Sequence, residues 1–407
     1  MKEKNSVKNF IWNAIGLTAN SIVSLAFLII VKLFNGVDDA GIFTYSYSLC
    51  ILFYYISIYY NRPFQIANAT DDKKFNSFFS ARIVTSILSL ISIIIFSVVS
   101  GFSFYKISII FLLMLFKTCD AISDVFHGDL QKKENLYMVG ISYVLKAILG
   151  IITFIILNYL TSNLIISILC LVVVNIIIFV FYDYKKFKLG YKEKLSLDFT
   201  DIKFILKSCL PIFLFQFISI YLVNCEKYVI TYFSSNELQT IFGILIMPAT
   251  VLSLVGNYLL IPFINKLHEF NCRGNLKEFK KLGNKMLFIL FGFGILALGV
   301  CYLIGIPVLN FIYQIDLDKY KISLLIIILG AVFNSGAMIC SGMLTILGKN
   351  KIQVYVYGVV SILTTILCYF AIKNDIIFGA SLTYLISCGM LFIVFAVIYI
   401  KNMSISR

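Results

Sequence analysis

Long apolar segments alternate with short polar segments along the whole chain. Twelve of them are long enough to cross about 30 Å of hydrocarbon, which takes about 20 helical residues. Most are rich in Ile, Leu and Phe, without the strict alternation of a membrane-spanning β-barrel. Because a helix satisfies its own backbone hydrogen bonds in lipid, the pattern predicts an all-α integral membrane protein. The predicted spans are residues 10–34, 40–60, 83–102, 107–127, 138–160, 163–182, 207–233, 239–263, 285–310, 321–347, 352–372 and 376–400.

Composition supports the same class. Of the 407 residues, 60% are apolar and 13% are charged, and the mean hydropathy is +0.95, whereas a soluble domain is about 45–50% apolar and about 25% charged. This contrast excludes a soluble enzyme, a secreted disulfide scaffold and a disordered chain. The net charge of +14 would suggest a nucleic-acid partner for a soluble protein. Here the positions of the basic residues point to a membrane, and we expect no nucleic acid.

The basic residues are divided unevenly between the two sets of loops. With the N-terminus placed inside, 26 of the 34 Lys and Arg residues fall in inside segments, 4 in outside segments and 4 within spans. Cytoplasmic loops of membrane proteins carry such an excess, so both termini are predicted to be cytoplasmic. The first apolar segment is longer than the core of a signal peptide, and we expect it to remain as a span.

The short motifs of enzymes and metal sites are missing from the sequence. None of the ten cysteines forms a CxxC pair, and nine lie within predicted spans, where cysteine usually packs as a small apolar residue. The sequence has no phosphate-binding loop, GxSxG or HExxH. We therefore expect a protein that is not an enzyme and that holds no metal or cofactor.

A basic polar stretch divides the spans into two sets of six. We expect an N-terminal six-helix lobe over residues 1–184, a cytoplasmic linker over 185–206 and a C-terminal six-helix lobe over 207–407. A shift of 199 residues places Pro63-Phe64 on Pro262-Phe263, and proline is informative because the chain has only five. Two halves that both start inside predict parallel repeats around a central cavity.

Charged side chains inside the fourth and fifth spans are the main functional signal. Lys117, Asp120, Asp124 and His127 are spaced by 3, 4 and 3 residues, which places them on one helical stripe. Lys146 of the next span lies at a depth similar to that of Lys117, by a rise of 1.5 Å per residue. Asp120 can neutralise one lysine, and a bound anion could neutralise the other. The alternative is a structural Lys–Asp network between the two spans.

The seventh span carries a second polar group. Glu226 and Lys227 are adjacent, so they point about 100° apart and cannot both face lipid cheaply. The alternative is an interfacial pair that extends outward. Uncharged amides recur in other spans, where each could instead join two helices. We predict that the substrate cavity is lined by Lys117, Lys146, Lys227, Asp120, Asn20, Asn224, Gln216 and Asn257, and that Asp120 and Glu226 are candidates for coupling to Na⁺ or H⁺.

Several stretches of the chain resemble a known family of exporters. They are Ala40-Gly-Ile-Phe-Thr-Tyr-Ser-Tyr-Ser, Phe64-Gln-Ile-Ala-Asn, Phe78-Phe79-Ser-Ala-Arg82, Asp124-Val-Phe-His-Gly128, Leu210-Pro-Ile-Phe-Leu and Ile246-Met-Pro-Ala-Thr. Together with twelve spans in two sixes, this pattern resembles the Wzx-type polysaccharide flippases of the multidrug/oligosaccharidyl-lipid/polysaccharide exporter superfamily. The resemblance covers essentially the whole chain.

The resemblance implies two six-helix lobes, as in multidrug and toxic compound extrusion (MATE) transporters, around a cationic cavity in a bacterial cell membrane. It implies transport of undecaprenyl-pyrophosphate-linked oligosaccharide to the outer leaflet for capsule, O-antigen or exopolysaccharide synthesis. It also implies partners among membrane lipids, glycosyltransferases and a glycan polymerase. The headgroup role of basic residues in relatives is carried to Lys117, Lys146 and Lys227, since Arg62 and Arg82 are assigned to an inside loop or its edge.

Three other functions remain open from the sequence. A cation-coupled multidrug exporter of the same superfamily would suit the buried Asp120, although the excess of lysine in the spans argues against cationic cargo. A membrane glycan polymerase would be expected to carry a large outside loop, and the predicted outside loops are short. A purely structural membrane subunit would not need the buried ionic stripe.

Overall fold

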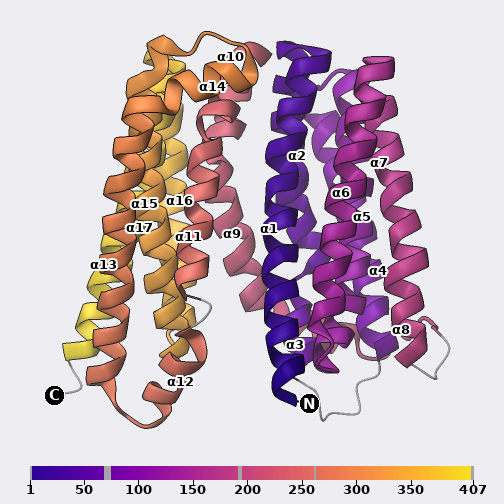
Figure 1. Ribbon diagram of the computed structural model, residues 1–407, viewed down its shortest axis with the longest axis vertical. Coiled ribbons are helices and arrows are strands. Elements are labelled where there is room, and N and C mark those ends of the chain that lie inside the picture. Colours follow the sequence, from indigo (N-terminus) through magenta and orange to yellow (C-terminus); the bar gives the residue numbers. More distant parts are fainter. Residues whose placement is uncertain (1, 68–74, 191–194, 261–262, 405–407) are drawn as a thin grey trace. The chain divides into compact units, whose positions relative to one another are not determined.

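A computed structural model describes residues 2–67, 75–190, 195–260 and 263–404 of the chain. Over these residues the elements are helices joined by turns, and none of the described residues forms a strand (Figure 1). Internal contacts divide the chain into two compact units, Met1–Phe217 and Ile218–Arg407. The predicted all-α membrane fold is confirmed.

The first unit is built around α5. Its elements are α1 (Lys2–Asn35), α2 (Val37–Ile58), α3 (Asn61–Ala67), α4 (Phe75–Val99), α5 (Phe104–Lys132), α6 (Leu136–Thr161), α7 (Leu164–Ile178), the π-helical turn η1 (Phe179–Tyr184), α8 (Lys185–Gly190) and the first part of α9 (Ile202–Phe233). Helix α5 contacts α2, α3, α4, α6 and α7, while α1 packs along α6. Its polar stripe therefore faces protein on most sides.

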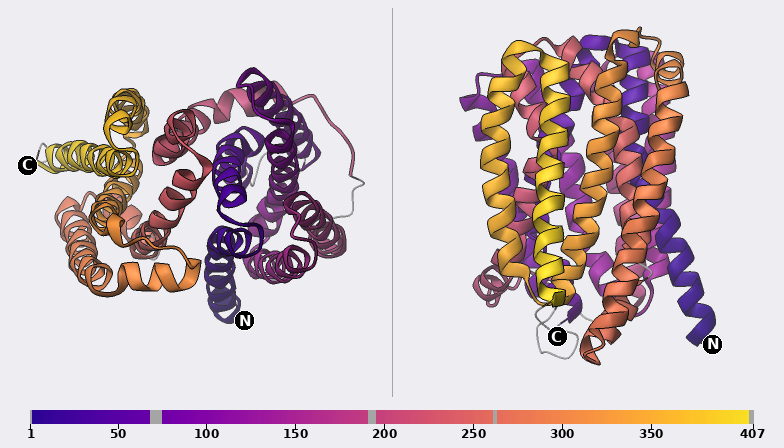
Figure 2. Two further views of the ribbon diagram at one scale, coloured as in Figure 1. Left: turned by 90° about the horizontal axis from the view of Figure 1, so that it is seen from above. Right: turned by 90° about the vertical axis from the view of Figure 1, so that its left-hand side faces the viewer.

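The second unit is arranged around α15. Its further elements are α10 (Asn236–Leu245), α11 (Met247–Leu260), α12 (Ile264–Cys272), α13 (Leu276–Val300), η3 (Cys301–Gly305), α14 (Ile306–Tyr313), η4 (Asp318–Tyr320), α15 (Lys321–Ile346), α16 (Asn350–Asn374) and α17 (Ile376–Ser404). Helix α15 packs against α11, α13 and α17, and α16 packs against α17. Figure 2 shows the long helices of this unit side by side.

Each of the twelve predicted spans coincides with a helix or with consecutive helices. Ten helical segments are long and apolar enough to cross a membrane. Helix α5 is also long enough, at 29 residues, but carries the charged stripe. The eighth predicted span is split into α10 and α11 next to Pro248, which lacks the backbone N–H that a continuous helix needs. The chain is a multi-pass membrane protein.

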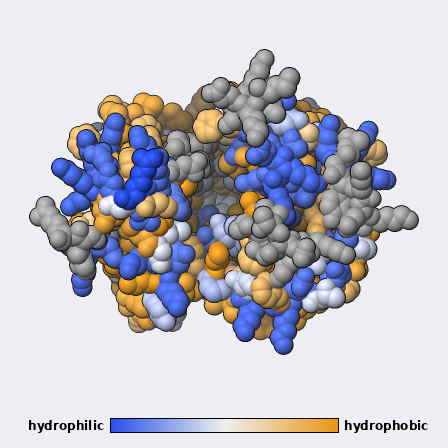
Figure 3. All heavy atoms as spheres, turned by 90° about the horizontal axis from the view of Figure 1, so that it is seen from below, coloured by the Kyte–Doolittle hydropathy of each residue, from blue (hydrophilic) through white to orange (hydrophobic). Residues whose placement is uncertain are grey.

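The polar ends of the helices agree with this placement. In the second unit, basic side chains are exposed on α12, α13 and the turn between them. They are Lys266, Arg273, Lys277, Lys280 and Lys281. Figure 3 views this end of the unit and shows hydrophilic residues gathered there. Between its ends, α13 exposes large apolar side chains, of which Phe288 is 81% exposed. Such a surface is suited to lipid.

Described residues of the predicted linker pack on the first unit. The Asn76 amide donates a hydrogen bond to Ser196 Oγ at 2.9 Å, and the backbone N–H of Asp198 donates to Ser80 Oγ at 2.7 Å. Ile205 joins a buried apolar cluster that contains residues of α4, α5 and α8. This segment therefore contributes buried contacts to the first unit, and the boundary between the units along the chain falls inside α9.

Helices α1 and α6 approach closely at a pair of glycines. A Cβ built on Gly140 would overlap the Trp12 carbonyl oxygen, and one built on Gly16 would lie 2.6 Å from the Gly140 Cα. Any side chain at Gly140 must therefore push the two backbones apart.

We expect Gly140→Ala to destabilise the protein by about 1–3 kcal/mol through this overlap. Gly292→Ala is the matched control, because a Cβ on Gly292 of α13 meets nothing within 4 Å and alanine favours a helix by up to about 1 kcal/mol. Thermal unfolding of the purified variants in detergent measures the difference. Equal melting temperatures would contradict the close packing of α1 on α6.

Candidate functional site

The polar stripe of α5 takes part in a charged cluster inside the first unit. We use the term charged cluster for Arg62, Arg82, Lys117, Asp120, Asp124, His127, Lys146 and Asp183. These residues come from α3, α4, α5, α6 and η1, and every one of them has an ion-pair partner in the cluster. The stripe positions its side chains because its 3, 4, 3 spacing follows the helical repeat.

One half of the charged cluster is a chain of lysines and carboxylates. Asp120 Oδ2 lies 3.3 Å from Lys117 Nζ, and Asp120 Oδ1 lies 3.6 Å from Lys146 Nζ. Lys146 Nζ also lies 3.4 Å from Asp183 Oδ2 and donates to Ser123 Oγ at 2.7 Å. Two lysines are therefore matched by two carboxylates. This is the Lys–Asp network that the sequence left open as the alternative to a bound anion.

Neutral groups complete this half of the cluster. Asn175 of α7 donates to Asp120 Oδ1 at 2.9 Å, and His127 Nε2 lies 3.2 Å from Asp183 Oδ1. The ammonium of Lys117 is 5.2 Å from the centre of the Tyr47 ring, within the range of a cation–π interaction. Both lysine side chains are nearly buried, at 13% and 10% exposure. The lysine half is a closed network.

The other half of the cluster joins two arginines through one carboxylate. Asp124 Oδ1 lies 2.9 Å from Arg62 Nη1, and Asp124 Oδ2 lies 3.0 Å from Arg82 Nη2. Arg62 Nη2 donates to Gln131 Oε1 at 2.8 Å, and Arg82 donates to Asn61 Oδ1. Arg82 is fully buried, and its Nε and Nη1 have no hydrogen-bond partner among the described residues. Positive charge is therefore in excess here.

These arginines correct the sequence analysis, which assigned Arg62 and Arg82 to an inside loop or its edge. Arg62 lies in α3, and Arg82 lies two turns inside α4, which begins at Phe75 rather than near residue 83. The hydropathy of this helix is lowered at its start by Asn76, Ser77, Ser80 and Arg82, so the apolar pattern locates the helix start too late. These polar residues are buried against protein, not exposed to water.

A pocket opens beside the arginine half. Its volume is about 550 Å³, within the range of about 300–1,000 Å³ that is typical of small-molecule sites. Arg62 and Gln131 supply donors at its wall, Asp124 supplies a carboxylate, and the other lining residues are apolar or aromatic. The lining residues are Ile58, Tyr60, Arg62, Pro63, Ile66, Asp124 and Gln131. All of them belong to the first unit.

The polar group of the seventh predicted span lies on the second-unit part of α9. Lys227 Nζ donates to Asn224 Oδ1 at 3.2 Å. Glu226 is fully buried, and neither carboxylate oxygen has a hydrogen-bond partner in the described part of the chain. Glu226 faces the interior of its unit, and it interacts electrostatically with Tyr384 and Cys388 of α17. It is therefore not an exposed interfacial residue.

The remaining predicted site residues are more scattered. Asn20 is exposed on α1, and Gln216 is half-buried on α9. The side chain of Asn257 lies outside the described residues. The structure thus brings Lys117, Asp120 and Lys146 together. Among the described residues, no hydrogen bond joins Asn20 or Gln216 to the charged cluster.

Two partners of the cluster were missed by sequence reasoning. Asp183 directly follows the sixth predicted span, beside Lys185 and Lys186, and was treated as part of a basic cytoplasmic stretch. Asn175 lies in the middle of that span. A search for polar residues within the sixth span would have found Asn175, whereas Asp183 lies just beyond the span in the π-helical turn η1.

The chain is similar to a protein of capsule synthesis. It is 25% identical over 391 residues to the capsular polysaccharide biosynthesis protein CapF of Staphylococcus aureus, covering 94% of this chain and 96% of that protein. No protein-family model matches the chain.

Its fold is that of solved MATE transporters of the superfamily predicted above. A multidrug resistance MATE family transporter in an inward-facing conformation matches with a TM-score of 0.72 and 12% identity, over 97% of this chain and 98% of that one. An outward-facing MATE structure matches with a TM-score of 0.63 and 15% identity, over 99% of this chain and 96% of that one. A superfamily transporter from Pyrococcus furiosus, described by a reversed polarity of its binding pocket, matches with a TM-score of 0.58 and 14% identity. The match covers 99% of this chain and 96% of that one. The resemblance predicted from the sequence is confirmed.

Loss of the single carboxylate in the arginine half should lower the stability of the protein strongly. We expect Asp124→Asn to lower the stability of the protein by about 3–5 kcal/mol, because the fully buried Arg82 and the part-buried Arg62 then lose their ion-pair partner. Glu269→Gln is the control, since its pair with Arg273 is exposed and such pairs contribute at most about 1 kcal/mol. Thermal unfolding in detergent measures both.

A second variant separates charge from packing. Adding Arg82→Met to Asp124→Asn removes one of the unpaired guanidiniums and should recover part of the lost melting temperature. If Asp124→Asn and Glu269→Gln unfold at the same temperature, the excess positive charge is not buried as described.

Proposed function

We propose that this protein flips an undecaprenyl-pyrophosphate-linked oligosaccharide from the cytoplasmic to the outer leaflet of a bacterial cell membrane, for synthesis of capsule, O-antigen or exopolysaccharide. The observation that carries the proposal is the pocket at Arg62, beside the arginine half of the charged cluster, where two guanidiniums share one carboxylate. The fold shared with exporters and the similarity along nearly the whole chain to a protein of capsule synthesis support it.

The chemistry of the substrate suits this pocket. A pyrophosphate diester carries about two negative charges, and moving it through hydrocarbon unaided is very costly. Guanidinium groups bind phosphate oxygens through two parallel N–H donors. Arg62 lines the pocket with its charge shared between Asp124 and Gln131. An incoming phosphate would compete with Asp124 for this guanidinium.

Other predicted residues keep supporting roles in the proposal. Lys117, Lys146 and Lys227 extend the positive field, although the first two already have carboxylate partners. Amide side chains at Asn20, Asn224, Gln216 and Asn257 would bind sugar hydroxyls. The lipid tail stays in the bilayer, so only the polar head needs a protein path.

The proposal also includes the setting in the cell. The excess of basic residues in one set of loops supports cytoplasmic termini. Glycosyltransferases would supply the substrate on that side, and a polymerase would take up the product on the other. We propose that Na⁺ or H⁺ drives the cycle through Glu226 or Asp120.

A cation-coupled multidrug exporter is the second candidate, because the solved structures of this fold include multidrug transporters. The charges of the cluster disfavour it. Four basic residues face three carboxylates there, and the excess positive charge adjoins the pocket. Such a site repels the cationic cargo of that class.

We expect Arg62→Gln to reduce export about tenfold or more, because a hydrogen bond to a charged group contributes about 1.5–3 kcal/mol. The measurement is surface glycan in a flippase-deficient strain that carries the variant, with membrane expression checked. Arg273→Gln is the matched control, since Arg273 is 73% exposed and lies outside the charged cluster. Normal glycan with Arg62→Gln would remove the pocket from the mechanism.

Glu226→Gln tests the coupling role. The amide has nearly the same shape, and the carboxylate oxygens lack hydrogen-bond partners among the described residues, so we expect unchanged or higher thermal stability. If Glu226 exchanges a proton during transport, export by the variant should fall at least tenfold and become insensitive to a pH gradient. Flipping of a fluorescent lipid-linked oligosaccharide in proteoliposomes, with and without the gradient, measures this. An unchanged gradient response would exclude Glu226.

A further inference from the structure

A second pocket lies in the second unit. Helix α10, which contributes to its wall, lies at the end of the unit opposite α12 (Figure 1). Its volume is about 540 Å³, which again falls in the range of about 300–1,000 Å³ for small-molecule sites. Its walls come from α10, from η4 and the first turn of α15, and from the turn between α16 and α17. Every lining residue belongs to the same unit.

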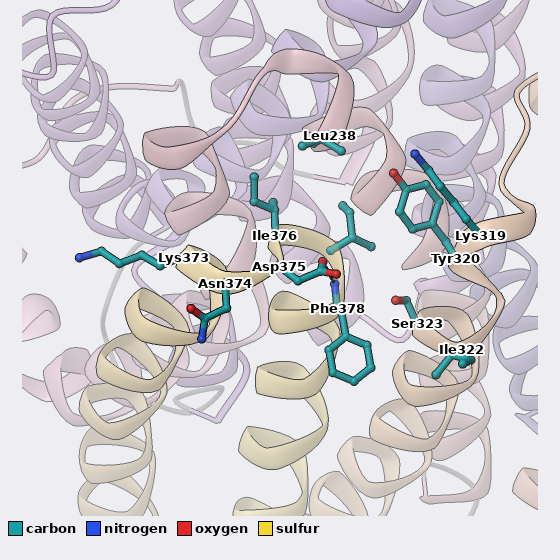
Figure 4. A pocket seen from close by; sticks show the side chains of 11 residues that line it. Leu238, Lys319, Tyr320, Ile322, Ser323, Lys373, Asn374, Asp375, Ile376 and Phe378 are labelled. Carbon is teal, nitrogen blue, oxygen red and sulfur yellow. Dashed lines mark hydrogen bonds between the residues drawn. The ribbon is translucent and has the colours of Figure 1, made fainter.

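Polar groups converge on this pocket from separate elements. In Figure 4, the Ser323 hydroxyl and the Asp375 carboxylate point toward the space between them, the Tyr320 hydroxyl lies at the rim beside the Lys319 ammonium, and Lys373 points away. Ser323 is 4% exposed, and no hydrogen bond to its hydroxyl is found among the described residues. Because Ser323 lines the pocket, its hydroxyl is accessible to a ligand there.

The remaining surface of the pocket is apolar and aromatic. Leu238, Ile376 and Phe378 lie beside the polar groups. One oxygen of Asp375 accepts the Phe378 backbone N–H at 2.9 Å, which fixes the carboxylate at the edge of the pocket and leaves its other oxygen available. A ligand that fits must therefore carry hydroxyl donors together with an apolar C–H face.

The charges around the pocket disfavour an anion. Lys319 lies 4.9 Å from the Tyr320 ring centre, and it interacts electrostatically with Glu237 and Asp316. Asp375 adds another negative charge. Lys319 and Lys373 line the pocket together with one carboxylate, Asp375. Because Lys373 points away from the space (Figure 4), a phosphate headgroup would meet the Asp375 carboxylate directly.

We propose that this pocket binds a neutral sugar residue. A pyranose presents hydroxyls around its rim and C–H groups on its faces, so it can donate to Asp375, bond to Ser323 and Tyr320, and pack on Leu238 and Phe378. The pocket is formed by turns that the predicted orientation places outside. Resting on the proposed flippase function, the inference is that the glycan is held here on the exit side.

Direct binding of defined sugars tests the proposal. The full chain in nanodiscs is mixed with maltose or N,N′-diacetylchitobiose, and saturation transfer from protein to sugar is recorded by NMR. Glycerol 1-phosphate is the anionic comparison. The test variants are Tyr320→Phe and Asp375→Asn, and Lys373→Gln is the matched control from the same rim. Size-exclusion profiles show that each variant is folded.

We expect the wild type and Lys373→Gln to bind at least one disaccharide equally, and Tyr320→Phe and Asp375→Asn to bind it about tenfold more weakly. No transfer to either disaccharide, equal binding by all variants, or preferred binding of glycerol 1-phosphate would each overturn the proposal.

Complementation of a flippase-deficient strain separates this inference from the function on which it rests. If the wild type restores surface glycan but binds no sugar, only the sugar site fails. If the wild type does not restore glycan, the proposed function fails, while the NMR result still decides whether the pocket binds sugar.

Discussion

The first unit depends on the cost of placing charge away from water. An ionised side chain near the middle of a membrane costs at least about 2.5–3.5 kcal/mol on insertion scales, and α5 carries three such charges and a histidine on one stripe. Each neighbouring element supplies a partner for that stripe: Arg62 from α3, Arg82 from α4, Lys146 from α6 and Asp183 from η1. Because these partners must all reach one helix, α5 takes the central position among them.

The π-helical turn at the end of α7 shows how closely the backbone follows this requirement. A π turn adds one residue to the helical repeat, so side chains beyond it are rotated by about 100° relative to a regular helix. Asp183 lies in this turn and is fully buried between Lys146 and His127. Sequence periodicity assumes a regular helix, which is why the position of Asp183 could not be predicted from its spacing.

Much of the fold could be predicted from the sequence because hydropathy reports directly on helices that cross lipid. The stripe on α5 and the matched depth of Lys117 and Lys146 also follow from spacing alone, and the two lysines do share Asp120. The partners of Lys146 and Asp124 from other helices could not be predicted, because the residue pattern of a single span does not determine which helices pack against it. Arg82 was missed for the opposite reason: its polar surroundings on α4 resemble a loop until the tertiary contacts bury them.

Counting charges shows which part of the cluster can take up an anion. Lys117 and Lys146 share Asp120 and Asp183, so adding a phosphate there would leave a carboxylate without its partner. Arg62 and Arg82 share only Asp124, so a phosphate would restore neutrality instead of disturbing it. The second unit buries Glu226, whose oxygens lack hydrogen-bond partners in the described residues and whose neighbour Lys227 interacts with it electrostatically. The proposed function accordingly assigns the anion to Arg62 in the first unit and includes Glu226 of the second unit as a candidate for the coupling cation, because the two ligands then would not compete for the same groups.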